Sequence, residues 1–482
     1  MSAPTRIIAG PFNRVEGDLE IRLDIEDGRV VAARVNSPLF RGFERMLRGK
    51  DPRDALTITP RICGICSVSQ SAAAARALAA AQGLAPTPEG AIAAAIIHGV
   101  ENLADHLTHF NLFFMPDFAK PVYEGAGFHE QAIARFAAGA GSAVRAAVDA
   151  RTQLLHIMGL LAGKWPHTLA IQPGGVTKAP DARDKVRIIA LLRAFRAYLE
   201  ADLFAGPLEA FAELADPGTL RRWHRAGTAG DARLFLDAAD ATALGEMGRG
   251  PDRFMSFGAY HLDEGPLFRA GLLRGGILSD VPHDAIVEDI SHAWMEGGAH
   301  HPFEGETSPD PAMAEPGYTW CKAPRLAGET VEVGALARQI VDGHSLARAL
   351  GQGGADARAR VIGRLLEIAR LVIELEKLAL RLDPGADFIR HGAIPDEGRG
   401  AGLVEAARGS LGHWVVLKNG RIANYQIIAP TTWNFSPRDA DGSAGPVEAA
   451  LEGAPVRAGE VTPIAVQHIV RSFDPCMVCT VH

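Results

Sequence analysis

The sequence of 482 residues has few cysteines, only 6% aromatic residues and no long apolar run. Five cysteines are too few, and odd in number, for a secreted disulfide framework. No apolar stretch approaches the roughly 18 residues of a membrane span. No Lys/Arg tract occurs and the net charge is −8, so nucleic acid is a poor candidate partner. The first residues lack a basic stretch followed by an apolar one, so no secretory leader is predicted and a cytoplasmic protein is expected.

The composition is otherwise ordinary for a folded protein, with 47% hydrophobic and 22% charged residues. At roughly 150 residues per domain the length suggests about three domains, but no clear linker divides the chain. We therefore expect one unit over 1–482, an α+β fold that is mainly α, with a large multi-helix body and small peripheral β-hairpins. The segment 1–40 is expected to be β-rich, 67–382 helical, and 401–482 to combine a β-hairpin with a C-terminal segment.

Apolar alternation around turn residues predicts two β-hairpins. In the first, strands over 19–25 and 30–35 flank the turn Glu26-Asp-Gly-Arg29; in the second, strands over 413–418 and 421–428 flank Asn419-Gly420. Apolar residues that recur every three to four positions predict helices. These helices are expected at 67–83, 88–115, 128–164, 181–204, 331–349 and 356–382.

Four of the five cysteines form two C-x-x-C pairs, Cys63 with Cys66 and Cys476 with Cys479. This spacing brings two soft sulfur ligands to one metal. A structural zinc site is the commonest meaning of two pairs, but its pairs usually lie about 15–20 residues apart. A redox dithiol needs a single pair in a βαβ setting, which is absent. The third interpretation is a buried metal centre that joins the two ends of the chain and makes the C-terminal segment metal-binding. Cys321 stands alone and is expected to be a buried small hydrophobe.

Arg61-Ile-Cys-Gly-Ile-Cys66 and Asp474-Pro-Cys-Met-Val-Cys-Thr-Val-His482 resemble the two signature motifs of the nickel–iron hydrogenase large subunit. Further stretches agree with that family in order, and together they make the match specific over essentially the whole chain. They are Asn13-Arg-Val-Glu-Gly17, Arg41-Gly-Phe-Glu44, Gly163-Lys-Trp-Pro-His167, Tyr318-Thr-Trp-Cys-Lys-Ala-Pro-Arg325, Arg408-Gly-Ser-Leu-Gly-His-Trp414 and Tyr425-Gln-Ile-Ile-Ala-Pro-Thr-Thr-Trp-Asn434.

The resemblance implies a nickel and an iron held by the four cysteines, with CO and cyanide as further ligands of the iron. By the family pattern Cys63 and Cys476 bind nickel alone, while Cys66 and Cys479 bridge both metals. The implied reaction is heterolytic cleavage of hydrogen, in which Cys476 takes the proton and Glu16 relays it towards solvent.

The resemblance also implies a polar surround for the metals. Arg408 would lie over the open bridging position, held by Asp105 and Asp474. Thr431 would donate a hydrogen bond to a cyanide, and Pro430 would shape that pocket. A magnesium site next to the centre is expected from three further groups. They are the Glu44 carboxylate, the Ile427 carbonyl and His482.

Three departures from typical catalytic members point to the hydrogen-sensing, or regulatory, branch of the family. A histidine four residues after the second cysteine is replaced by Gln70, so a titratable neighbour is lost. Two bulky residues, Ile65 and Phe113, map to positions where the gas route narrows between small aliphatic residues, and are expected to hinder oxygen. Most catalytic members carry a C-terminal extension that is cut after the final histidine, and the sequence ends at His482. It is either a mature form or a chain that never had a tail, as in sensors.

The expected function is therefore that of a hydrogen-sensing hydrogenase large subunit with slow turnover. The runner-up is an energy-converting uptake hydrogenase; a non-enzymatic quinone-site subunit and a structural zinc protein are disfavoured. With only Cys321 left over, iron–sulfur clusters are expected in a separate small subunit. A histidine kinase and the hydrogenase maturation proteins are the other expected partners.

Overall fold

A computed structural model describes residues 5–482 of the chain. At its N-terminal end β1 (Thr5–Ala9), β2 (Glu20–Glu26) and β3 (Arg29–Asn36) form an antiparallel sheet in that order. The predicted hairpin is confirmed, and its turn places Asp27 and Gly28 at positive φ. Residues 1–4 of the predicted β-rich segment lie outside the described residues.

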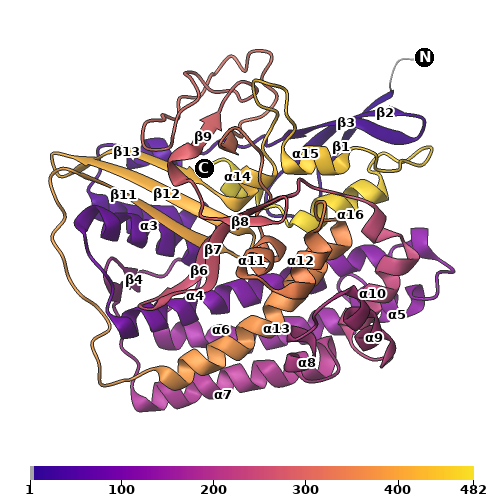
Figure 1. The fold of residues 1–482 in the computed structure, drawn as a ribbon, viewed down its shortest axis with the longest axis horizontal. Helices are drawn as coiled ribbons and strands as arrows, with labels where there is room; N and C mark the ends of the chain where they lie inside the picture. The colour runs from indigo at the N-terminus through magenta and orange to yellow at the C-terminus, as the bar shows by residue number, and fades with distance from the viewer. Residues whose placement is uncertain (1–4) are drawn as a thin grey trace.

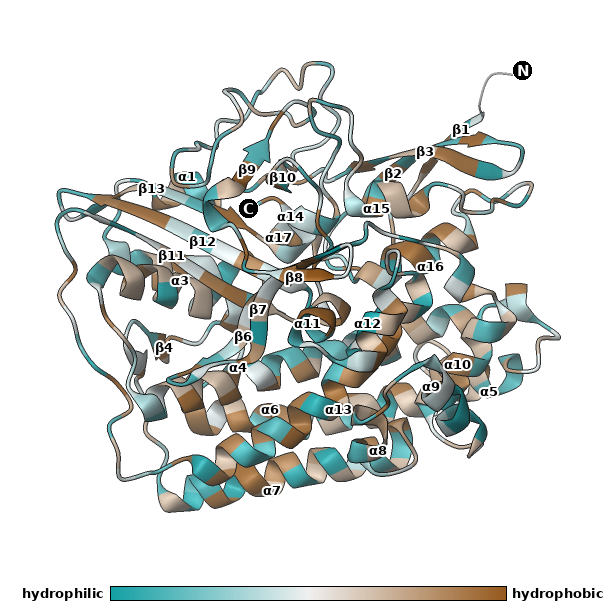
Figure 2. Ribbon diagram, in the orientation of Figure 1, coloured by the Kyte–Doolittle hydropathy of each residue, from teal (hydrophilic) through white to brown (hydrophobic). Residues whose placement is uncertain are grey.

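The helical body is built on five of the predicted segments, and four of its long helices, α4, α6, α7 and α13, lie side by side across the lower half of Figure 1. They are α3 (Ser67–Gln82), α4 (Pro88–Thr108), α6 (Ser142–Leu161), α7 (Ala182–Tyr198) and α13 (Ala357–Arg381). On α7 the residues Ile188, Leu192 and Phe195 are buried, at the spacing of an amphipathic surface helix. Figure 2 accordingly shows teal and brown segments alternating along α7. The mainly helical fold class is confirmed.

Two predicted helices are each broken in two by glycine. The segment 128–164 contains α5 (His129–Phe136) and α6, because a Cβ at Gly141 would lie 2.3 Å from the Arg135 carbonyl oxygen. The segment 331–349 contains α11 (Ala335–Asp342) and α12 (Ser345–Gly351), because Gly343 ends α11 with φ +96°. Only glycine adopts this left-handed conformation without strain. The prediction of single helices there was wrong.

The second predicted hairpin is confirmed and is part of a larger sheet. β12 (Gly409–Lys418) and β13 (Arg421–Ile428) meet at Asn419-Gly420, where both residues have positive φ, as a two-residue hairpin turn requires. A strand not predicted, β11 (Gly398–Ala406), pairs with β12. A Cβ at Gly402 would lie 1.9 Å from the Ala73 carbonyl oxygen, so glycine lets α3 lie directly against β11.

The remaining elements are short or were not predicted. The central antiparallel sheet comprises β6 (Arg253–Leu262), β7 (Gly265–Arg274) and β8 (Ile277–Ser279). The two-stranded sheets are β4 (Ile171–Gln172) with β5 (Gly175–Val176), and β9 (Ile286–Asp289) with β10 (Ala323–Leu326). The other α-helices are α1 (Phe43–Leu47), α2 (Ala55–Ile58), α8 (Leu208–Ala212), α9 (Pro217–Arg225), α10 (Asp231–Ala241), α14 (Pro430–Asn434), α15 (Pro446–Leu451), α16 (Ile464–Phe473) and α17 (Met477–Thr480).

The largest cluster of buried side chains runs from the long helices to the strands β11–β13 and includes all four paired cysteines. A second cluster packs the N-terminal sheet against α15 and α16. Figure 1 shows the C-terminus inside the outline of the molecule, beside α14, and the last residue, His482, is only 6% exposed. Within residues 5–482 no helix is both long and apolar enough to span a membrane.

Candidate metal centre

The two C-x-x-C pairs come together although they lie at opposite ends of the chain. Cys63 and Cys66 precede α3, whereas Cys476 precedes α17 and Cys479 lies within it. The four sulfur atoms all lie within 4.8 Å of one another. The Cys66–Cys479 and Cys476–Cys479 sulfur separations are 3.1 and 3.0 Å, and no disulfide forms. The two ends of the chain therefore build a single four-sulfur site.

The electrostatics of the four thiols call for a cation. Hydrogen bonds from Cys476 and the other thiols hold the pKa of Cys63 well below its ordinary value. The contact with Cys476 raises the pKa of Cys66 well above its ordinary value. Burial does the same to the pKa of Cys479. Four thiolates within 5 Å would repel one another in a buried site. A soft metal ion supplies the charge that lets all four ionise, so the donor set fits nickel and iron.

Arg41 links the two cysteine motifs through the backbone. Its Nη2 atom donates to the Ile62 carbonyl at 2.6 Å and also to the Val478 carbonyl. The first carbonyl precedes Cys63 and the second precedes Cys479. Arg41 belongs to one of the motifs in the sequence, but the sequence indicates no role for it, because backbone acceptors leave no signal in a sequence.

Arg408 lies between two buried carboxylates. It follows the end of β11, and it contacts Asp105 on α4 and Asp474 at the C-terminal end of α16. Burial lowers the pKa of Arg408, but Asp105 and Asp474 outweigh burial and raise it above the ordinary value. Burial also raises the pKa of Asp105, to about 7, whereas Arg408 helps to hold that of Asp474 below its ordinary value against burial. The structure thus brings together the three residues that the sequence proposed as a group.

Behind this group lies a network of buried charges that the sequence did not reveal. Arg364 on α13 lies 3.3 Å from the Asp474 carboxylate and donates to His106 Nδ1 at 3.1 Å. His106 Nε2 lies 3.1 Å from Glu367, which pairs with Arg338. Arg364 and Glu367 stand on a helix rich in arginine and glutamate, so in the sequence they look like ordinary surface residues. Only the packing of α13 against α4 shows that they support Asp474.

Glu16 and Thr431 both contact the backbone around Cys476. Glu16 forms a parallel bridge with Cys476, and its carbonyl accepts from Met477 N at 2.6 Å. Its side chain is half-buried, and burial followed by the nearby Cys63 raises its pKa. The Thr431 hydroxyl accepts from Cys476 N at 3.1 Å, which leaves its own hydrogen available to donate. Pro430 begins the helix α14 that carries Thr431.

Gln70 lies one helical turn after Cys66 and is hydrogen-bonded to a histidine. Its Oε1 atom lies 2.8 Å from His413 Nε2, and His413 Nδ1 lies 2.8 Å from the Tyr425 hydroxyl. Because Gln70 Oε1 only accepts, His413 carries its proton on Nε2 and accepts from Tyr425. Burial lowers the pKa of His413 to about 3, so this chain of polar groups stays uncharged.

Glu44, Ile427 and His482 converge beside Cys479. His482 Nε2 lies 2.9 Å from the Ile427 carbonyl and 3.4 Å from Glu44 Oε1. Neighbouring ligands of an octahedral cation with bonds of about 2.0–2.1 Å are separated by about 3 Å, so these donor atoms fit a hard cation. Burial would raise the pKa of Glu44, but Lys322 and His482 lower it to about 2. The adjoining cavity of about 20 Å³ is large enough for one water or ion.

Ile65 and Phe113 lie on different elements. Ile65 stands between Cys63 and Cys66 and packs against the main core. Phe113 lies in the π-helical turn His109–Phe114 and is half-buried, whereas Phe110 and Phe114 on the same turn join an aromatic cluster. The narrowing of a gas route by these two side chains stays a prediction. Cys321 is fully buried and donates to the Lys322 carbonyl.

Known proteins share both the sequence pattern and the fold. The family described as nickel-dependent hydrogenase matches residues 41–126 and 235–482. The large subunit of the periplasmic [NiFeSe] hydrogenase of Desulfomicrobium baculatum is 31% identical, with 99% of this chain and 95% of that protein covered. The uptake hydrogenase large subunit of Rhodobacter capsulatus is 26% identical, with 100% and 96% covered.

Solved structures agree. The H2-activated [NiFeSe]-hydrogenase of Dm. baculatum superposes with a TM-score of 0.86 at 29% identity, covering 99% of this chain and 100% of that one. The Ni-Fe-Se hydrogenase of D. vulgaris Hildenborough in its reduced state gives 0.86 at 28% identity, with the same coverage. With its four-cysteine site, its family match and relatives that share its whole length, the chain belongs to the nickel-dependent hydrogenase family, as a large subunit.

Proposed function

We propose that this large subunit cleaves hydrogen heterolytically and reports its presence to a regulatory partner. The observation that carries the catalytic part is the cluster of four buried thiols next to Glu16 and Arg408. A nickel–iron centre bound there, with CO and cyanide on the iron, would supply the chemistry that cleaves the H–H bond. Cys63 and Cys476 would hold the nickel, and Cys66 and Cys479 would bridge both metals.

The protein groups around the centre handle the proton and fix the geometry. Cys476 is the proposed proton acceptor, and Glu16, whose backbone pairs with Cys476, relays the proton outward. Arg408 presents a fixed positive charge that Asp105 and Asp474 orient. The hydroxyl hydrogen of Thr431 is proposed to hold a cyanide, in a pocket that Pro430 shapes. Glu44, the Ile427 carbonyl and His482 are the proposed magnesium ligands.

The sensing role rests on Gln70, Ile65 and Phe113. Gln70 and His413 form a pair that does not titrate near neutral pH, so this side of the site holds no exchangeable charge. Bulky Ile65 and Phe113 are proposed to admit hydrogen and hinder oxygen. A small subunit would carry the iron–sulfur clusters and pass the signal to a histidine kinase in the cytoplasm. The alternative, hydrogen uptake for energy conversion, is supported by the name of the Rhodobacter capsulatus relative.

The first test is an infrared spectrum of the chain, produced together with its small subunit and maturation proteins, with and without hydrogen. Bands of iron-bound CO and cyanide that shift under hydrogen support the proposal. Zinc without nickel in the same sample contradicts it. Slow turnover together with kinase binding then supports sensing, whereas fast turnover without kinase binding supports uptake.

The oxygen barrier is tested with the double variant Ile65→Val and Phe113→Leu. Hydrogen oxidation by the variant should become sensitive to oxygen, because the passage widens while the metal ligands stay the same. A variant that withstands oxygen as well as the parent would contradict the barrier.

A further inference from the structure

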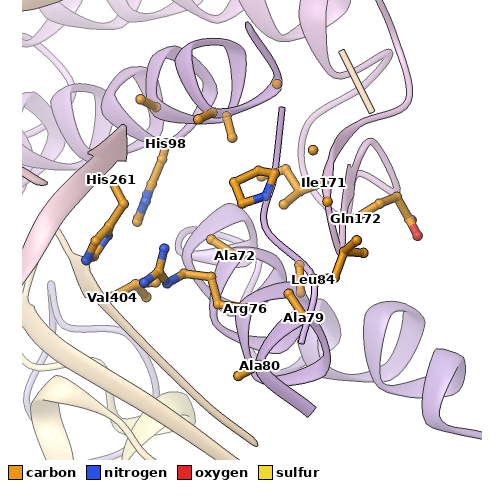
Figure 3. A pocket seen from close by; sticks show the side chains of 18 of the residues that line it. Ala72, Arg76, Ala79, Ala80, Leu84, His98, Ile171, Gln172, His261 and Val404 are labelled. Carbon is orange, nitrogen blue, oxygen red and sulfur yellow. The ribbon is translucent and has the colours of Figure 1, made fainter. Parts of the chain in front are cut away.

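A cavity of about 280 Å³ lies away from the cysteine site, between α3, α4, β6, β11 and the β4–β5 hairpin. Its walls are mostly small and apolar, and Figure 3 shows how they enclose it. The apolar lining comprises Ala72, Ala75, Ala79, Ala80, Ala91, Ala94, Ala95, Leu84, Ile171, Ala401 and Val404. No carboxylate is among the lining residues.

Arg76 is the only fully charged group in this lining. The residue is exposed to solvent, although the surrounding protein lowers the pKa of its guanidinium, and within residues 5–482 it forms no ion pair. Four deeply buried arginines of the chain each face a carboxylate, whereas Arg76 has no such partner among residues 5–482. They are Arg338, Arg360, Arg364 and Arg408. Arg76 therefore presents a guanidinium without a carboxylate partner to a cavity that is partly open to solvent, where an anion can reach it.

Two histidines, His98 and His261, lie beside the guanidinium of Arg76 at one side of the cavity, as Figure 3 shows. Burial, with the charge of Arg76 as a further cause, lowers the pKa of both His98 and His261 to about 3. The histidines are therefore neutral and add hydrogen-bonding atoms but no charge. His98 Nε2 lies 3.0 Å from Ser69 Oγ, which itself donates to Glu101, so His98 is held in one orientation. The cavity thus offers one positive charge, two neutral polar rings and apolar walls.

We propose that this cavity is a binding site for a small monocarboxylate with a short apolar body. The guanidinium fork of Arg76 matches the two oxygens of a carboxylate, and the alanine-rich walls suit a hydrocarbon chain. A dianion such as phosphate would need a second cation, which these walls do not provide. Pockets of roughly this size hold small ligands in other proteins.

The experiment uses the complete complex of this chain with its small subunit, and hexanoate as the probe. Binding is measured by calorimetry, with hexanamide as the uncharged analogue of the same shape and inorganic phosphate as the competing anion. We expect hexanoate to bind about 10- to 100-fold more tightly than hexanamide, the range of one charge-assisted pair. Equal binding of the two, or tighter binding of phosphate, would overturn the proposal.

Two variants separate charge from space. Arg76→Gln removes the charge and should weaken the binding of hexanoate by about 10- to 100-fold. It should leave the binding of hexanamide unchanged. Ala79→Leu keeps the charge and fills the cavity, so it should weaken both. Arg187→Gln, at an exposed position of α7, is the matched control and should leave binding unchanged. Thermal midpoints check that each variant is folded. Unaltered hexanoate binding by folded Arg76→Gln would contradict the site, as would a crystal of the complex that places hexanoate elsewhere.

Discussion

Arg408 holds Asp474 at two points. Its Nε donates to the Asp474 backbone carbonyl at 3.0 Å, and its Nη2 donates to the side-chain carboxylate at 3.2 Å. Asp474 stands two residues before Cys476 and has a positive φ of 57°, so this contact fixes the backbone that presents a metal ligand. The same guanidinium reaches Asp105 on α4. One side chain therefore joins the start of β12, the helix α4 and the C-terminal cysteine motif.

Arg408→Lys should lose at least about 100-fold in hydrogen cleavage, the range for removing a preorganised charged donor. Lysine keeps a positive charge, but a single ammonium cannot reproduce contacts made from Nε, Nη1 and Nη2 at once. Nickel content and the infrared bands should stay near the parent values, because the thiol ligands are intact. Arg399→Lys, at an exposed position on β11, should be silent. Full activity of Arg408→Lys would show that charge alone suffices.

Glu16→Gln should slow the exchange of deuterium gas with solvent protons by about 100-fold or more, the range for losing a general base. An amide keeps the shape of Glu16 but cannot take a proton. The variant should still bind hydrogen, and the shift of the infrared bands measures this binding. Glu26→Gln, at the exposed end of the same N-terminal sheet, is the control. Exchange at the parental rate in Glu16→Gln would assign the relay to another group.

The two C-x-x-C motifs indicated the candidate metal ligands, because each motif consists of a few adjacent residues; their spacing left a zinc site and a redox dithiol open, and the resemblance to a known family favoured the shared centre. The Asn419-Gly420 turn revealed a hairpin for the same reason. By contrast, Arg364, a second partner of Asp474, lies on α13, and nothing local distinguishes it from an arginine at the surface. These charges form a site only once α13 packs against α4, which a sequence pattern does not encode.

The strand β6 was not predicted, because a fully buried strand lacks the alternation of apolar and polar residues that indicates a strand. Seven consecutive residues from Phe254 to Tyr260 are buried, so apolar and polar residues do not alternate and the usual strand signal is absent. The breaks at Gly141 and Gly343 were missed because a single glycine inside a helical pattern is weak evidence. Their effect depends on neighbouring backbone, such as the Arg135 carbonyl beside Gly141.

Cys479→Ser and Cys321→Ser should differ in metal content. Cys479 shares its site with three other sulfurs, and a hydroxyl is a much poorer ligand for soft metals than a thiolate. Elemental analysis should therefore show loss of nickel from Cys479→Ser. Cys321 is also buried, but its sulfur contacts the Lys322 carbonyl, so Cys321→Ser should keep its nickel. Loss of nickel from both variants would mean that general unfolding, not ligand loss, empties the site.

Glu448 on α15 makes the stability of the fold depend on pH. Burial raises the pKa of its carboxyl group to about 7. Oε1 accepts from Val35 N and from the Tyr318 hydroxyl, both at 2.9 Å, whereas Oε2 is buried with no hydrogen-bond partner among residues 5–482. The folded protein thus holds this proton more tightly than the unfolded chain does. Its stabilisation is complete below the unfolded pKa of about 4.3 and is lost as the pH rises through 7.

Glu448→Gln should remove this dependence, because an amide keeps the acceptor for Val35 and Tyr318 and never ionises. The raised pKa corresponds to about 3 kcal/mol of stability that the parent loses between pH 4 and pH 8. The quantity to compare is the thermal midpoint of the variant minus that of the parent. This difference should be a few degrees larger at pH 8 than at pH 5. Glu397→Gln, at an exposed position before β11, should show no such change. A difference that is the same at both pH values would mean that Glu448 is ionised throughout, held by Arg438 at 3.9 Å.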